Sequence, residues 1–252
     1  MDDTIAVSIG VAVLMFAAGV LGLFLQRILP EHHTKEHSRD MIGAMIGLIT
    51  LLLALVLGLL IWTAYGVFSV QKTELQTMAA RALEFDLEMA QYGPEGKHGR
   101  EVLRKDLVWA VEQFWGSDES RAAAYDASYA NMDSMMKFLE NLHPETDAQR
   151  GLLAEARTRY GGIGETRLLM SLQLIDAVSW PLLITVTSWS CLLFCGFGLL
   201  SRVNATTLVA LALGACSVAS AIFLILDFSQ PYTSPLRISP AALEQVIVDL
   251  DK

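Results

Sequence analysis

Residues 41–70 of this 252-residue chain read MIGAMIGLITLLLALVLGLLIWTAYGVFSV, a stretch without a single Asp, Glu, Lys or Arg. The hydrocarbon core of a bilayer is about 30 Å thick and is crossed by roughly 20 apolar residues of helix. The stretch is longer than one crossing needs, so the helix either tilts or continues into water. Because the residues that follow keep helical periodicity, the sequence favours continuation.

Three further stretches lack charged side chains and are long enough to cross a bilayer: 5–25, 177–201 and 203–226. The first differs from a cleavable signal peptide, because Asp2 and Asp3 stand where such a peptide carries basic residues. We therefore expect it to remain as a transmembrane helix. The very short connection between the last two stretches predicts an antiparallel hairpin of helices.

The charged part between the second and third spans, 71–176, holds 12 basic and 18 acidic residues. Apolar residues recur there at alternating steps of three and four, which is the spacing of one face of an α-helix, and no window shows the period of two of a strand. The expected apolar faces are Leu75, Met78, Ala82, Phe85 and Met89; Leu103, Leu107, Ala110, Val111 and Phe114; Tyr125, Tyr129, Met132, Met136 and Leu139; and Leu153, Ala156, Tyr160, Ile163, Met170 and Leu174.

These patterns predict an all-α membrane protein, with four transmembrane helices and a helical bundle inserted between the second and third spans. The expected parts are two transmembrane helices in 1–70 with a linker at 26–40, the bundle at 71–176, the transmembrane hairpin at 177–226 and a C-terminal part at 227–252. The chain carries a net charge of −9. An acidic bundle is a poor surface for nucleic acid, so the expected partner is the lipid bilayer.

Arg167 falls on the apolar face of the last expected bundle helix. In one interpretation its long side chain reaches from the edge of the bundle to water, as basic side chains readily do. In the other it is a buried arginine that pairs with an acid, Asp86 or Glu84, and holds the bundle in register. The first interpretation describes the commoner behaviour of such side chains.

The linker holds three histidines among acidic residues: His32, His33 and His37. Imidazole and carboxylate groups bind zinc or nickel, but no spacing here matches a zinc motif. A solvated linker near the lipid headgroups is the competing and simpler interpretation. The sequence shows no nucleotide-binding loop and no nucleophile motif, so we expect neither an enzyme nor a bound cofactor.

The fourth span is followed at 227–240 by the stretch DFSQPYTSPLRISP. An acid, aromatic residues, prolines and an arginine in this order predict a defined loop at the membrane interface, in which Pro231 shapes the backbone and Tyr232 suits the belt of aromatic side chains. Asp227 either pairs with Arg237 across the turn or, as an ionisable group at the membrane border, lines the vestibule of an ion path. A short amphipathic helix is expected to follow.

Basic residues beside the membrane indicate which side each loop faces. Four spans place both termini and the bundle on one side of the membrane. Arg27, Lys35 and Arg39 in the linker, and Arg202 in the last turn, favour the cytoplasm for the short loops. We therefore expect the termini and the bundle outside the cytoplasm, although basic residues also flank the spans on the bundle side.

Short motifs along the chain are shared with one family. They are Ala54–Ile61; Leu83, Asp86, Leu87 and Tyr92–Glu95; Thr166–Leu169; Ser179–Pro181; Phe197–Leu199; Asn204–Thr206; and Ile222–Leu226. With them the chain resembles the bestrophin-like domain family of bacterial membrane proteins over nearly its whole length. The loop departs from the family pattern, because Tyr232 replaces a phenylalanine and Ser234 stands near an expected glycine.

The resemblance implies a multi-pass protein of the cell inner (plasma) membrane and a homo-oligomer. The family itself is of uncharacterised function, and its name marks a distant similarity to bestrophins, which are pentameric anion channels. Bestrophins have four spans and a helical bulk that faces the cytoplasm, which is opposite to the orientation expected from charge. Their pore motif is not visible in the second span, so no pore residue is carried over.

Two functions from different classes follow. The first is an oligomeric ion channel, which by analogy with bestrophins would conduct anions. In such a channel the second span lines the pore, and rings of leucine gate it by excluding water. The alternative is a non-conducting membrane scaffold or envelope sensor whose bundle docks an unknown partner protein. The few polar or semi-polar side chains that the second span offers to a pore are Thr50, Trp62, Thr63, Tyr65 and Ser69.

Overall fold

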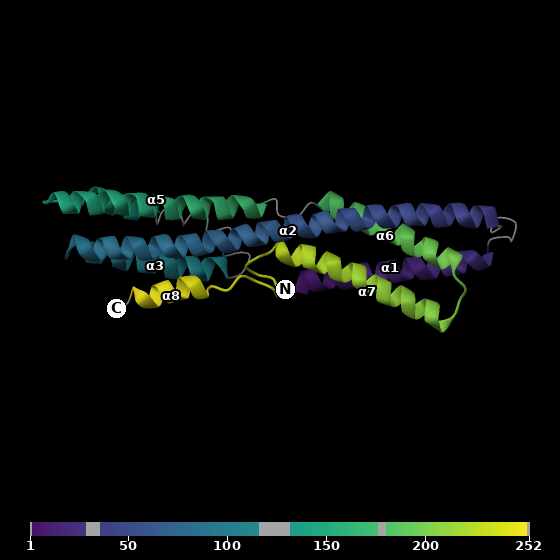
Figure 1. The fold of residues 1–252 in the computed structure, drawn as a ribbon. Helices are drawn as coiled ribbons and strands as arrows, with labels where there is room; N and C mark the ends of the chain where they lie inside the picture. The colour runs from purple at the N-terminus through teal and green to yellow at the C-terminus, as the bar shows by residue number, and fades with distance from the viewer. Residues whose placement is uncertain (1, 29–35, 116–131, 176–179, 251–252) are drawn as a thin grey trace. The chain divides into compact units, whose positions relative to one another are not determined.

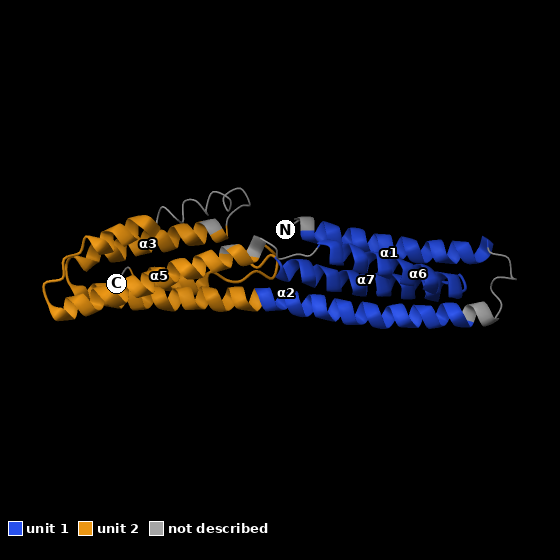
Figure 2. Ribbon diagram, turned by 90° about the horizontal axis from the view of Figure 1, so that it is seen from above, with its two compact units in different colours: residues 1–67, 177–229 blue, residues 68–176, 230–252 orange. Residues whose placement is uncertain are grey.

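The computed structural model describes residues 2–28, 36–115, 132–175 and 180–250, and within these ranges all regular structure is helical. The chain divides into two compact units, which Figure 2 colours separately. Unit 1 consists of residues 1–67 and 177–229, and unit 2 of residues 68–176 and 230–252. The expectation of an all-α protein is confirmed for the described residues.

Four helices are long and apolar enough to cross a membrane. They are α1 (Asp2–Ile28), α2 (Glu36–Tyr92), α6 (Trp180–Leu200) and α7 (Ala205–Phe228). The helix α2 has 57 residues without a break, so the expected continuation of the second span is confirmed. The side chain of Asn204 caps α7 by accepting a hydrogen bond of 2.6 Å from the backbone N–H of Thr207, which fixes where that helix begins.

Glycines let two helices of unit 1 approach each other closely. A methyl group placed on Gly22 of α1 would lie 2.0 Å from the carbonyl oxygen of Cys195 on α6, and one on Gly198 would lie 2.1 Å from the carbonyl oxygen of Gly19. Backbone contact through small residues is a common way for helices to pack in lipid. The helices α1, α6 and α7 pack side by side in this unit (Figure 1).

Unit 2 contains the second part of α2, α3 (Gly96–Phe114), helical residues 132–140, α5 (Asp147–Ile175) and α8 (Ala241–Asp249). The predicted apolar faces form one buried core, which includes Met78, Phe85 and Leu107. Gly93, with φ of 119°, makes the turn between α2 and α3, a conformation that glycine adopts without strain. Tyr125, Tyr129 and the junction at 176–179 lie outside the described residues.

The segment after α7 packs into unit 2 rather than forming a separate loop. Tyr232, Ile238, Leu243 and Val246 belong to the core of that unit, and Tyr232 is only 1% exposed. Its expected place in an aromatic belt at the lipid surface is therefore wrong. The hydroxyl of this tyrosine finds a partner inside the bundle, which explains why a residue with a polar group is buried here.

Candidate functional site

The part of α2 in unit 1 has one packed face. Ile46 and Leu53 lie in a cluster with Val186 and Leu193 of α6. Gly196 of α6 allows this contact, since a methyl group there would lie 2.7 Å from the end of the Ile46 side chain. This half of α2 is therefore held against α6 along one side.

The opposite face of α2 is uncovered in the single chain. Only 11% of its most apolar 18-residue window is buried, against 28% to 33% for the other three candidate spans. Trp62 is the extreme case, with 73% of its surface exposed. We call this surface the open face of α2. It is formed by Leu48, Leu51, Leu55, Leu59 and Trp62.

The predicted pore-lining residues divide into two groups. Trp62 lies on the open face and Ser69 is exposed in the same helix, whereas the ring of Tyr65, 49% exposed, lies 5.6 Å edge to face from that of Phe228 on α7. The hydroxyl of Thr50 donates to the carbonyl oxygen of Ile46 at 2.8 Å, and that of Thr63 lies 3.0 and 3.1 Å from two carbonyl oxygens of its own helix. Because both hydroxyls donate within their own helix, the two threonines offer a permeating ion oxygen lone pairs and no hydrogen-bond donor.

A buried ion pair lies at the centre of unit 2. Arg167 Nη1 on α5 donates to both carboxylate oxygens of Asp106 on α3, at 2.8 and 2.9 Å. The two residues are 3% and 4% exposed. The hydroxyl of Tyr160 donates to the same carboxylate at 3.3 Å. Burial, with the negative charge of Asp106 second, raises the pKa of Tyr160, so this hydroxyl keeps its proton and remains a donor.

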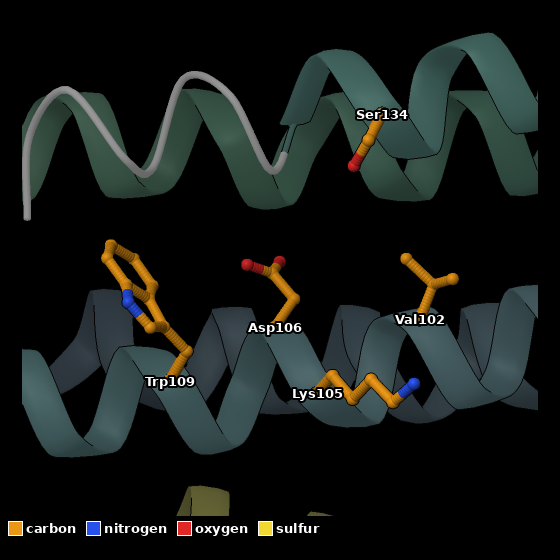
Figure 3. Close-up of a pocket in the computed structure, with 5 residues that line it drawn as sticks. All are labelled: Val102, Lys105, Asp106, Trp109 and Ser134. Carbon is orange, nitrogen blue, oxygen red and sulfur yellow. The ribbon is translucent and has the colours of Figure 1, made fainter.

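The carboxylate of Asp106 also lines a cavity of about 310 Å³, together with Val102, Lys105, Trp109 and Ser134. In Figure 3 the side chains of Val102, Asp106 and Trp109 point from α3 toward the helix that carries Ser134. The guanidinium of Arg167 balances the charge of the Asp106 carboxylate. The arrangement therefore fixes the register of α3 against α5 and offers little free charge to a ligand.

The expected partners of Arg167 are corrected by this geometry. Asp86 pairs instead with Arg100 at 2.5 Å, and Glu84 pairs with Arg159 at 3.2 Å. The interpretation in which Arg167 reaches water is also wrong. Both errors have one reason: the arginine occupies a core position of α5, and only an acid at a core position of another helix can meet it.

A second buried polar cluster joins α2, α5 and the segment after α7. Tyr232 donates its hydroxyl to Gln71 Oε1 at 2.6 Å, and Gln71 Nε2 donates to the carbonyl oxygen of Met170 at 3.2 Å and to Gln173 Oε1 at 2.8 Å. Gln71 is not among the residues predicted from the sequence. A signal existed, because Gln71 lies four residues before Leu75 and so continues the apolar face of α2.

The tyrosine of this cluster is enclosed by rings. The ring centres of Phe114 and Trp115 lie 5.3 and 5.1 Å from that of Tyr232. Burial, followed by the charge of Glu74, raises the pKa of Tyr232. The neutral hydroxyl is therefore the form that the folded chain holds against Gln71.

The other residues of the predicted interfacial loop have separate places. Pro231 is buried, and its carbonyl oxygen accepts a hydrogen bond of 2.7 Å from the N–H of Ile238, which closes the loop. Asp227 is fully buried in unit 1, whereas Arg237 is exposed in unit 2. Their ion pair, like the vestibule role of Asp227, stays a prediction.

The residues of the metal site considered in the linker are largely outside the part of the chain that the structure describes. Among the described residues no group of three or more His, Cys, Asp or Glu side chains is placed to hold a metal ion. His32, His33 and the side chain of His37 lie outside the part of the chain that the structure describes.

The four apolar helices, together with a second helical unit, are those of a membrane-embedded protein whose described regular structure is all helical. The sequence matches the profile of the Bestrophin-like domain over residues 13–243, nearly the whole chain. The protein therefore belongs to the Bestrophin-like family, as the resemblance of its motifs indicated. Neither the curated proteins nor the solved structures include a match.

Proposed function

We propose that this protein assembles with further copies of itself into an ion-conducting pore lined by the open face of α2, with anions as the conducted species. This proposal rests on the difference in burial between α2 and the other three spans. The latter bury 28% to 33% of their most apolar windows in the chain itself, and α2 buries 11%.

The glycines of α2 support a protein partner for this span. A methyl group added at Gly43, Gly47, Gly58 or Gly66 would meet nothing within 4 Å. Glycine destabilises a helix interior by about 1 kcal/mol relative to alanine, and lipid chains gain nothing from it. Small residues do let neighbouring helices approach closely, so four of them in one span favour contact with α2 of other copies.

The side chains of the open face suit a hydrophobic gate. No charged residue lies between positions 41 and 70, and Leu48, Leu55 and Leu59 are exposed there. Rings of such leucines close a pore by excluding water. The indole N–H of Trp62 is a donor, which is the polarity that an anion requires.

Planar-bilayer recording of the purified full chain tests this proposal. Leu55→Thr should wet the gate and raise the open probability several-fold. Leu213→Thr is the matched control: Leu213 is 65% exposed on α7, and its replacement should leave conductance unchanged.

Two results would overturn the proposal. One is the absence of conductance for both the wild type and Leu55→Thr in several anions and at several pH values. The other is a single-copy mass in detergent. Either result would favour the non-conducting scaffold or sensor, whose acidic bundle docks a partner protein.

We further propose that the protein lies in the cell inner membrane with its termini and unit 2 outside the cytoplasm. The bases of the short loops, Arg27 and Arg202 among them, support this orientation. An alkaline phosphatase fused after Lys252 should then be active. A stable but inactive fusion would reverse the orientation.

A further inference from the structure

A cavity of about 320 Å³ opens in unit 2 between the start of its α2 portion and the segment 237–242. Two basic side chains line it, Lys72 and Arg237, and apolar side chains form much of the remaining wall. No acidic side chain is among the described residues that line the cavity. The apolar lining residues are Phe68, Leu75, Ile238, Ala241 and Ala242.

Among the described residues the two bases have no acidic partner, whereas several other bases of unit 2 do. Arg100, Arg159 and Arg167 each meet a carboxylate within 3.5 Å. Neither Lys72 nor Arg237 forms an ion pair with any described residue. Residues 71–176 hold more acids than bases, so a cavity lined by two bases and by no described acid is a local exception to the general charge of the unit.

The backbone adds to the positive potential of the cavity. Ala241 and Ala242 line it with the first turn of α8, a helix of nine residues. The N–H of Ala241 donates to Ser239 Oγ at 3.2 Å, and those of Leu243 and Glu244 donate to the carbonyl oxygen of Pro240. The contribution of the turn to an anion is therefore the N–H of Ala242 and the helix dipole, with Glu244 as the acid of the same turn. The side chains of these alanines are small, so they leave that turn accessible.

The segment that carries Arg237 is held in place. The N–H of Arg237 donates to the carbonyl oxygen of Ser234 at 3.2 Å. The carbonyl oxygen of the next residue, Ile238, accepts a hydrogen bond of 2.7 Å from the indole N–H of Trp115. A fixed backbone lowers the entropy lost when the arginine binds a ligand.

We propose that this cavity binds a phosphate group, carried by an anionic phospholipid. Lysine, arginine and a helix N-terminus are the groups that recognise phosphate in proteins. The apolar wall suits the glycerol and first methylene groups of a lipid. Lys72 is also the first charged residue after the charge-free stretch 41–70, where a helix leaving the membrane meets the headgroups. The proposal does not depend on ion conduction.

A bound phosphate would connect two segments that are distant in the sequence. Lys72 belongs to α2, and Arg237 belongs to the segment after α7. The hydrogen bond between Gln71 and Tyr232 already joins these segments. The lipid would therefore stabilise unit 2 at the same junction.

Native mass spectrometry of the delipidated full chain in a neutral detergent tests the proposal. The ligands are phosphatidylglycerol, phosphatidylcholine and inorganic phosphate, the last added as a competitor of the first. The test variant is Lys72→Gln/Arg237→Gln. The matched control is Lys97→Gln/Arg150→Gln, which removes the same two charges from exposed positions of unit 2.

We expect phosphatidylglycerol to bind the wild type and the control with equal affinity, and the test variant at least tenfold more weakly, since each lost charge-assisted contact costs about a factor of ten or more. Lys72→Arg/Arg237→Lys should restore binding. Complete competition by millimolar inorganic phosphate would assign the site to free phosphate. Persistence of the lipid would assign it to the headgroup.

Two results would contradict the proposal that the cavity binds a phosphate group. Equal loss of affinity in the test variant and the control would show that only the net charge matters. Equal affinity of the wild type for phosphatidylcholine and phosphatidylglycerol would show that the cavity does not recognise an anion.

Discussion

Arg167→Met removes one half of the buried ion pair between α5 and α3. The carboxylate of Asp106 would remain 4% exposed, with the hydroxyl of Tyr160 at 3.3 Å as its remaining described donor. Removing one partner of a buried pair costs about 3–5 kcal/mol, because the other charge is left uncompensated. We expect a loss of unfolding free energy in that range.

The matched control is Arg150→Met. Arg150 lies on the same helix, but its side chain is 60% exposed, as is 94% of the side chain of its partner Asp147. Exposed pairs of this kind contribute about 0–1 kcal/mol. A third variant, Asp106→Asn/Arg167→Met, removes both charges and should recover about 1–3 kcal/mol of the loss, because no uncompensated charge stays buried.

Guanidinium titration of the full chain in a neutral detergent, followed by circular dichroism, measures these differences. A loss of about 4 kcal/mol shifts the midpoint by about 1 M if the slope is about 4 kcal/mol per M. If Arg167→Met shifts the midpoint no more than Arg150→Met, or if the double variant is less stable than Arg167→Met, the ion pair does not hold α3 and α5 in register.

Three further outcomes are expected. Gly22→Ala should lower the thermal midpoint of the full chain, at a cost of about 1–3 kcal/mol or more, because the added methyl group would meet the carbonyl oxygen of Cys195; Gly10→Ala, with nothing within 4 Å, should not. Tyr232→Phe should cost about 1–3 kcal/mol in denaturant titration, because Gln71 Oε1 loses its buried donor. Because burial raises the pKa of Tyr232 in the folded chain, the unfolded chain releases this proton first, above about pH 10. Stability should therefore fall as the pH rises beyond that value, and less steeply in Tyr232→Phe; equal slopes would contradict this assignment.

The spans and the continuous α2 helix could be predicted because their signal is local. A stretch without charge and of sufficient length specifies a transmembrane helix whatever surrounds it. The apolar spacing of Met78, Ala82 and Phe85 likewise needs only the helix itself. The structure places these three residues in the core of unit 2.

The partner of Arg167 was not predicted, because the choice depends on which helices pack together. Asp86 and Glu84 both flank Phe85, away from the apolar face of α2. Asp106 lies between Leu103 and Leu107, on the apolar face of α3, and all three residues are buried. A polar residue on an apolar face is best paired with another of the same kind, and this rule selects Asp106 from the sequence.

The open face of α2 could not be predicted from the sequence. The leucines of the packed and open faces are chemically alike, and the charge-free stretch contains both. The contacts of Ile46 and Leu53 with α6, and the burial of Ala64 in the cluster formed with α1 and α7, separate the two faces. The partner of the open face is outside the chain, so it had to be proposed.

The hydrogen bond between Gln71 and Tyr232 also orders the biogenesis of the protein. Tyr232 follows α7 in the chain, so the ribosome makes α6 and α7 before the core of unit 2 can be completed. Until then the cluster that holds Leu75, Met78 and Phe85 lacks its members from residues 232–250. Synthesis of the last two apolar helices thus precedes the final folding of unit 2, and we expect a chain arrested before that step to present apolar surface to chaperones and proteases.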